Sequence, residues 1–113
     1  MITATVYRRG DRYCGFEISG HAGYADSGED IICAAVSALS INAVNSIESL
    51  TDDQVEAEEG DGYLKCTFPE GLSEAGILLM ESMILGIRQT AESVSEETGE
   101  PFLKLVFEEE QSC

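Results

Sequence analysis

The sequence has few basic side chains: 6 Lys and Arg residues stand against 22 Asp and Glu residues in 113, a formal net charge of −16. A surface that follows nucleic-acid phosphates needs clustered Lys and Arg, so the composition disfavours direct binding to nucleic acid and to an anionic membrane. The same field would attract a cationic protein or peptide. The simpler interpretation is an acidic surface that keeps the protein in solution.

Long apolar runs are also scarce. The longest nearly apolar run, residues 77–85, is too short to span a membrane and contains Glu81. The first residues alternate between apolar and polar side chains and lack the apolar stretch of a signal peptide. From these absences we expect a soluble, cytoplasmic protein.

Cysteine occurs four times, without a CxxC pair or a Cys/His cluster at zinc spacing, so we expect no metal. An even count leaves two disulfides possible, but a chain with 43% hydrophobic residues does not need them. Cys14 and Cys66 occupy apolar positions of predicted strands, where a thiol packs as a small hydrophobic group. Cys113 is expected to be frayed at the chain end. This usage indicates a reducing compartment.

The hydrophobic periodicity predicts the order ββα-ββα-β. Alternating apolar residues indicate strands, and apolar residues at steps of three and four indicate helices. The expected strands cover about 2–8, 12–19, 55–57, 64–68 and 103–107, and the expected helices cover about 31–50 and 72–94. We therefore expect one α+β domain over residues 1–113, a two-layer fold with both helices packed on one face of a largely antiparallel sheet.

Three apolar residues, Ile77, Leu78 and Leu85, lie off the predicted core stripe of the second helix. Exposed apolar side chains at these positions would suit a dimer contact. Packing against the last strand explains them equally well.

One short segment carries the residues that could perform chemistry. His21 lies in a glycine-rich connection, and Cys33 follows twelve residues later, three positions after Asp30. Asp30 stands where a helix N-cap belongs, and the positive end of a helix favours the thiolate form of a nearby cysteine. A loop that returns toward its helix would place His21 beside Cys33 as a Cys–His pair. A solvated histidine and a buried structural cysteine are the alternative interpretation.

Other motifs fit less well. A phosphate-binding loop would need the Lys of GxxxxGK[ST], which is absent. A cysteine phosphatase would need an Arg about six residues after its nucleophile to bind phosphate in bidentate fashion. Leu39 occupies that position.

The stretch GHAGYA at 20–25, followed by DIICAAVS at 30–37, resembles the signature of the ribosomal-processing cysteine protease family, Prp. The chain length and the hairpin–loop–helix order are similar as well. The resemblance implies a cytosolic endopeptidase, usually a homodimer, that requires no cofactor and removes a short N-terminal extension from a protein of the large ribosomal subunit. The nucleophile of the family falls on Cys33 and its general acid/base on His21.

Three further residues belong to the candidate site. Asp30 would cap the helix, orient His21, or do both. Ser37, one turn after Cys33, would form a hydrogen bond near the thiolate, unless its own helix carbonyl accepts that bond. Gly20 would permit the tight turn before His21.

For the reaction, we expect backbone N–H groups at the helix start to hold the oxyanion and the glycine-rich loop to close as a lid over substrate. A different class of function also fits the charge. A non-catalytic acidic module could hold a basic ribosomal protein during assembly.

Overall fold

The computed structural model describes residues 1–25, 30–111 and 113. The elements are β1 (Ile2–Arg9), β2 (Arg12–Ser19), α1 (Ile31–Leu50), β3 (Glu56–Gly60), β4 (Tyr63–Thr67), α2 (Glu74–Thr98) and β5 (Leu103–Glu109). The predicted ββα-ββα-β order is therefore confirmed. Helix α2 begins slightly later than expected because the Ser73 side chain caps it by accepting the N–H of Gly76.

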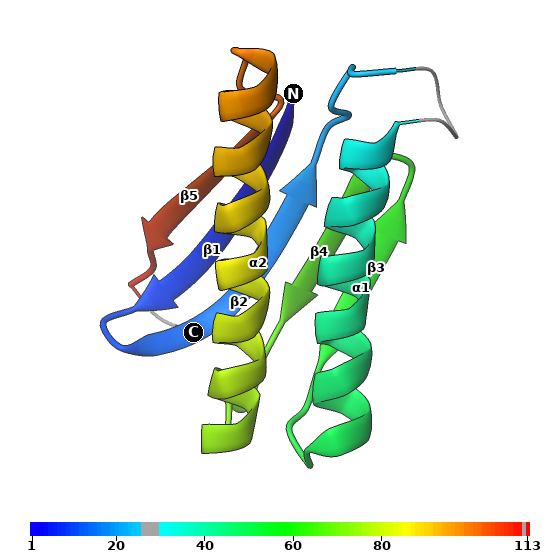
Figure 1. Cartoon of the computed structure of the whole chain (residues 1–113). Helices are drawn as coiled ribbons and strands as arrows, with labels where there is room; N and C mark the ends of the chain where they lie inside the picture. The colour runs from blue at the N-terminus through cyan, green and yellow to red at the C-terminus, as the bar shows by residue number, and fades with distance from the viewer. Residues whose placement is uncertain (26–29, 112) are drawn as a thin grey trace.

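The five strands form one sheet in the order β3-β4-β2-β1-β5. All neighbouring pairs are antiparallel except β1 and β5, which run parallel. Figure 1 shows the two helices side by side on one face of this sheet. The fold is thus the expected two-layer α+β arrangement with a largely antiparallel sheet.

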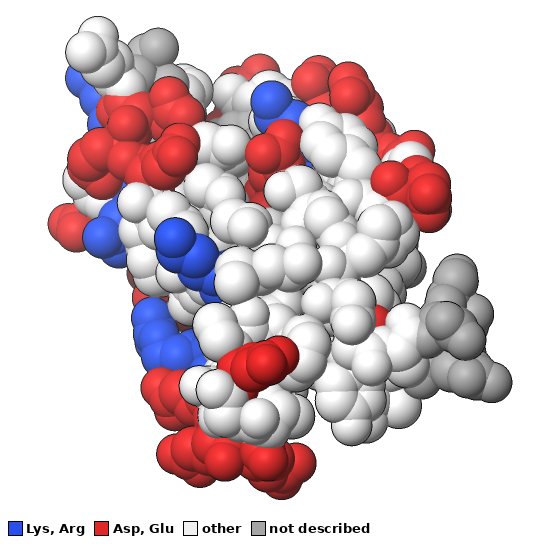
Figure 2. All heavy atoms as spheres, turned by 90° about the horizontal axis from the view of Figure 1, so that it is seen from above, with Lys and Arg blue, Asp and Glu red and all other residues white. Residues whose placement is uncertain are grey.

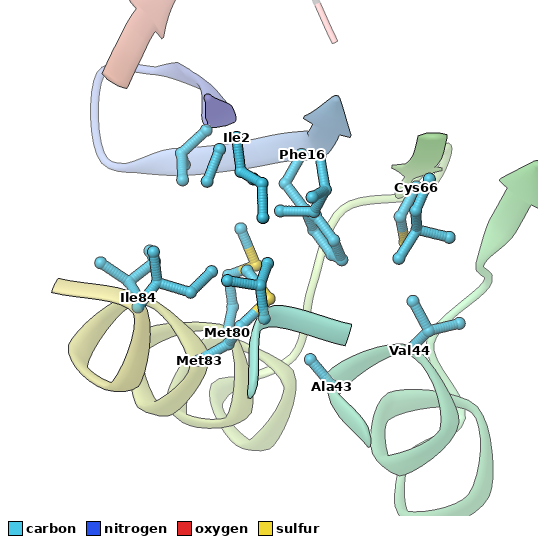
Figure 3. Close-up of a cluster of buried hydrophobic side chains, with 14 of the residues drawn as sticks. Ile2, Phe16, Ala43, Val44, Cys66, Met80, Met83 and Ile84 are labelled. Atoms are coloured by element: carbon cyan, nitrogen blue, oxygen red, sulfur yellow. The ribbon is translucent and has the colours of Figure 1, made fainter. Parts of the chain in front are cut away.

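The core lies between the sheet and the two helices (Figure 3). Apolar residues at alternate strand positions face the helices, and apolar residues at steps of three and four along each helix face the sheet. The side chains that Figure 3 labels are Ile2, Phe16 and Cys66 from the sheet, Ala43 and Val44 from α1, and Met80, Met83 and Ile84 from α2. This packing holds the start of α1 near the end of β2 and the beginning of β4.

The outer face of the helix layer keeps several large apolar side chains. Leu78 is 68% exposed and Leu85 52%, whereas Ile77 is half-buried. Packing against the last strand therefore does not account for Leu78 and Leu85. Leu50, the last residue of α1, is exposed as well.

Helix α1 is long and apolar enough, by length and composition alone, to cross a membrane. It is longer than the run 77–85, but serine and asparagine residues interrupt its apolar residues. The core helix of a soluble protein passes the same test, and Ile32, Val36 and Ile47 of α1 are buried in the core.

The prediction for Cys113 was wrong. Cys113 forms a disulfide with Cys14, 99 positions earlier in the chain. The parallel pairing of β5 with β1 explains this, because it carries the chain end to the β1–β2 hairpin, where Arg8 pairs with Glu109. Cys33 and Cys66 are free thiols.

Candidate active site

The start of helix α1 is fixed by Asp30, as predicted. Its backbone is extended, with φ −76° and ψ 102°, and its carboxylate Oδ1 accepts the N–H of Ile32 at 3.0 Å and of Cys33 at 3.1 Å. A carboxylate in this position satisfies two of the four N–H groups that a helix start leaves unpaired.

The second oxygen of Asp30 holds the preceding loop. Oδ2 accepts the N–H of Tyr24 at 3.0 Å and of Ala25 at 3.4 Å, and the residue is only 7% exposed. Burial by itself would raise the pKa of Asp30, but the backbone N–H groups of Cys33, Ala25, Tyr24 and Ile32 outweigh it and lower the pKa. Asp30 is therefore held as a carboxylate that joins the loop to the helix.

In the described part of the chain, Asp30 acts as a helix cap and not as a direct hydrogen-bond partner of His21. Within residues 1–25 and 30–111, no hydrogen bond joins the Asp30 carboxylate to His21. Asp30 caps the helix and holds the loop that carries His21, so any orienting effect on the imidazole passes through the backbone.

Cys33 is half-buried in the first turn of α1, and its sulfur accepts a hydrogen bond. The N–H of Ala22 lies 3.4 Å from Cys33 Sγ. The donor is the residue next to His21, so the loop does return to the helix as expected. The N–H groups of Ile32 and Cys33 at the helix start already donate to Asp30, so they are not free to bind the oxyanion as predicted.

The His21 side chain is 62% exposed and lies against the turn between β3 and β4. Its Nε2 atom is 3.8 Å from Oδ1 of Asp61, and its ring lies over Gly62. In the part of the chain that the structure describes, no hydrogen bond joins His21 to Cys33. Among the described residues, His21 and Cys33 thus share a site without a direct hydrogen bond.

They share it because both line one pocket of about 630 Å³ at the end of the sheet. Asp30, Ser37 and Gly20 line the same pocket, so all five predicted site residues are brought together. The remaining lining residues that sequence reasoning did not place there include Ser40, Ile41, Glu59, Asp61, Gly62 and Tyr63.

Ser37 and Gly20 differ in how tightly their surroundings constrain them. Ser37 is exposed one turn after Cys33, and the internal helix bond that we considered for it is made by Ser40, whose hydroxyl donates to the Val36 carbonyl at 2.7 Å. Gly20 has φ +92°, and a Cβ there would collide with the Met1 carbonyl oxygen. Only glycine fits this turn without strain.

The contribution of the β3–β4 hairpin to the site was not foreseen. The sequence 60–62 reads as a turn, but its proximity to His21 depends on the pairing of β2 with β4, which local pattern does not reveal. Residues 26–29 lie outside the described residues, so the predicted lid between His21 and Cys33 stays a prediction.

Figure 2 views the molecule from the end at which α1 begins and the β3–β4 turn lies. Acidic side chains gather in separate groups at the margins of this face, with a broad uncharged surface between them. Among the described residues no group of three or more His, Cys, Asp or Glu side chains is placed to bind a metal ion.

A free thiol at a helix start and a histidine in one pocket, on this α+β scaffold, are the components of a thiol-dependent hydrolase. The model of the family described as cysteine protease Prp matches residues 1–98. The ribosomal processing cysteine protease Prp of Bacillus subtilis is 36% identical over 94 residues, covering 77% of this chain and 84% of that protein. The chain therefore belongs to the cysteine protease Prp family and is a cysteine protease.

Solved structures agree on the fold. A protein from Streptococcus mutans is 35% identical, with a TM-score of 0.73 over 97% of this chain and 96% of that chain. Prp from Staphylococcus aureus, solved with a covalently linked product peptide, has a TM-score of 0.80 at 23% identity, over 96% of this chain and 100% of that one. Family membership favours the enzyme over the non-catalytic binding module.

Proposed function

We propose that this protease removes a short N-terminal extension from a protein of the large ribosomal subunit, with Cys33 as nucleophile and His21 as general acid and base. The observation that carries the proposal is the N–H of Ala22 donated to Cys33 Sγ within a pocket that His21 also lines. The relatives named as ribosomal processing proteases, one of them from Bacillus subtilis, support the choice of substrate.

The reaction begins when the Cys33 thiolate attacks the scissile carbonyl carbon and forms a tetrahedral intermediate. The Ala22 N–H lies 3.4 Å from the sulfur and can donate to the oxygen that becomes negative once the sulfur has lost its charge. Collapse of the intermediate breaks the C–N bond, and the imidazolium of His21 gives its proton to the leaving amine.

Deacylation uses the same two residues. His21, now neutral, takes a proton from a water molecule as that water attacks the thioester carbonyl. The second tetrahedral intermediate collapses, the carboxyl product leaves, and Cys33 returns as a thiolate. Neither half of the cycle requires a redox change or a cofactor.

The charge supports a basic substrate. Ribosomal proteins are generally cationic, and a protein of net charge −16 attracts such partners over a distance set by ionic strength. We place the reaction in the cytosol, where ribosomes are assembled. The Cys14–Cys113 disulfide would be reduced in that compartment, and neither of its sulfur atoms belongs to the candidate site.

We also propose that the protein works as a homodimer. Leu78 and Leu85 leave an apolar strip on the outer face of α2, and Ile41 on α1 is 40% exposed. Burying these side chains against a second copy would remove them from water. Sedimentation velocity on Leu78→Glu should show a monomer, whereas Leu50→Glu, at the exposed end of α1, should leave the dimer intact.

The proposal is tested by incubating the protein with a synthetic peptide that spans the extended N-terminus of the ribosomal protein and following its cleavage by mass spectrometry. Cys33→Ala should abolish cleavage and change thermal unfolding only slightly, because the side chain is half-buried and packs at the margin of the core. His21→Ala should likewise be inactive. Full turnover by Cys33→Ala would rule out the assignment of the nucleophile.

Cys66 provides a matched control. Burial, with a smaller contribution from the Glu48 charge, raises the pKa of the Cys66 thiol to about 12, so it stays protonated and unreactive. Iodoacetamide at pH 8 should therefore alkylate Cys33, stop cleavage and leave Cys66 unmodified. Inactivation that follows Cys66 modification instead would contradict the assignment.

A further inference from the structure

The imidazole of His21 rests on a residue that has no side chain. Gly62 stands in the β3–β4 turn with φ +63°, and a Cβ built on it would lie 2.6 Å from Nε2 of His21 and 3.0 and 3.1 Å from two ring carbons. These distances are shorter than van der Waals contact. The ring occupies its present position only because residue 62 is glycine.

The backbone fixes the same two segments to each other. Strands β2 and β4 pair as far as Ser19 and Tyr63, and the N–H of Gly20 continues this pairing by donating to the Gly62 carbonyl at 2.9 Å. The residue that follows Gly20 is His21. The pairing of β2 with β4 therefore places His21 beside the β3–β4 turn, and the turn contacts its ring.

The neighbouring carboxylate contributes much less. Asp61 is 3.8 Å from the imidazole, but its side chain is 99% exposed. Ion pairs in water at such a distance have small effects because solvent screens them. The steric contact with Gly62 is the stronger constraint on the ring.

We propose that Gly62 is a positioning residue for the reaction, which holds the His21 imidazole at the wall of the pocket that Cys33 also lines. The inference rests on the proposed role of His21 as general acid and base. The imidazole and the sulfur then line one pocket, in which the leaving amine must receive a proton. The thiolate has its own donor in the Ala22 N–H, so it does not need direct contact with the ring.

The chain contains a control for the backbone cost of changing Gly62. Gly10, in the β1–β2 turn, has φ +58° and no atom within 4 Å of a built Cβ. Gly62→Ala and Gly10→Ala therefore impose a similar strain on a two-residue hairpin turn. The two variants differ in that only Gly62→Ala places a methyl group against the His21 ring. Because this ring is exposed, it can move aside to make room for the methyl group.

The experiment measures cleavage kinetics of the extension peptide for both variants. We expect Gly62→Ala to lower kcat by about 10- to 100-fold with KM nearly unchanged, because displacement of a catalytic group by about 1 Å has effects of this size. Gly10→Ala should stay within about twofold of the unmodified protein. If Gly62→Ala proves unstable, Gly62→Asn replaces it in the test, because asparagine tolerates the left-handed backbone, and we expect the same fall in kcat.

A second measurement follows the ring itself. His21 is the only histidine in the chain, so its Hε1 resonance can be assigned without ambiguity. This signal should move in Gly62→Ala and stay in place in Gly10→Ala, while iodoacetamide should alkylate Cys33 at equal rates in both.

The outcomes separate this inference from the proposed function. If His21→Ala is inactive but Gly62→Ala cleaves as fast as Gly10→Ala, the positioning role is wrong and the catalytic assignment stands. If His21→Ala cleaves normally, His21 is not the general acid and base, and the positioning role of Gly62 falls with it. A fall in kcat without movement of the imidazole signal would also overturn the positioning role.

Discussion

The two helices begin with the same device and use it differently. Asp30 caps α1 with a buried carboxylate that accepts four backbone N–H groups, two from the helix and two from the loop before it. Ser73 caps α2 with an exposed hydroxyl that accepts one, from Gly76, and donates to Asp53. Both start a helix and hold a second segment, but only the first holds that segment beside a cysteine.

This difference explains why one helix start became a site. At α1, the anchored loop brings the Ala22 N–H to Cys33 and His21 to the same pocket. At α2, Glu74 occupies the first turn and complements the helix dipole with a negative charge. A helix start becomes chemically useful when its cap holds a second segment and leaves a nucleophile beside an open space.

The largest effect should come from removing both roles of Asp30. Asp30→Ala loses the cap, worth ~1 kcal/mol, and the charge-assisted bonds to the loop, worth a further ~2 kcal/mol of unfolding free energy. Ser73→Ala should cost only ~1 kcal/mol. Urea unfolding measures both values. We also expect Asp30→Ala to lose peptide cleavage and Ser73→Ala to keep it; equal activity in the two variants would contradict the comparison.

A smaller effect separates the two roles of Asp30. Asparagine caps helices about as well as aspartate, so Asp30→Asn should retain the bonds to Ile32 and Cys33 while its amide cannot accept from Tyr24 and Ala25. The unfolding free energy should fall by ~1–2 kcal/mol, and cleavage should fall because the loop loses its anchor. Faster amide hydrogen exchange at residues 24 and 25, with exchange in α1 unchanged, would confirm the separation. Uniform loss of protection across α1 would count against it.

The smallest effect is a dependence on pH. The pKa of Asp30 is lowered from its ordinary value of 3.8, so its contribution to stability is fully present above that value and is lost as pH falls through the lowered pKa. The difference in unfolding free energy between the natural protein and Asp30→Asn should thus stay constant from pH 7 to about pH 5 and shrink below pH 3.8. Urea titrations at pH 7, 5 and 3 test this. A difference that does not change at pH 3 would show that the carboxylate charge is not what holds the loop.

Much of the architecture could be read from local pattern. Helix α1 has the predicted bounds, 31–50, because Asp30 is a strong cap and the apolar steps continue to Ile47. The faces of β1 and β2 are also as expected, since alternation leaves only one side to bury. Leu50 continues the apolar steps of α1 but is exposed, because periodicity does not tell where a helix passes the edge of the sheet it covers.

Local pattern likewise predicts only part of the candidate site. Asp30, Cys33 and Ser37 lie within one cap and two helical turns, so their proximity is a consequence of helix geometry. Gly62 and Asp61 lie about forty positions from His21 in the sequence, and only the pairing of β2 with β4 brings them to its ring. The end of the chain follows the same rule, since Cys113 meets Cys14 through the parallel pairing of β5 with β1.

By itself, the sequence determined the helix starts, the strand faces, the acidic surface and the presence of one histidine and one cysteine at a capped helix, because each depends on residues a few positions apart. Tertiary structure decided where the imidazole points, which residue supports it and which N–H groups are free to act. Those outcomes depend on how distant strands pair and pack, and the free energy of that packing is a property of the whole fold.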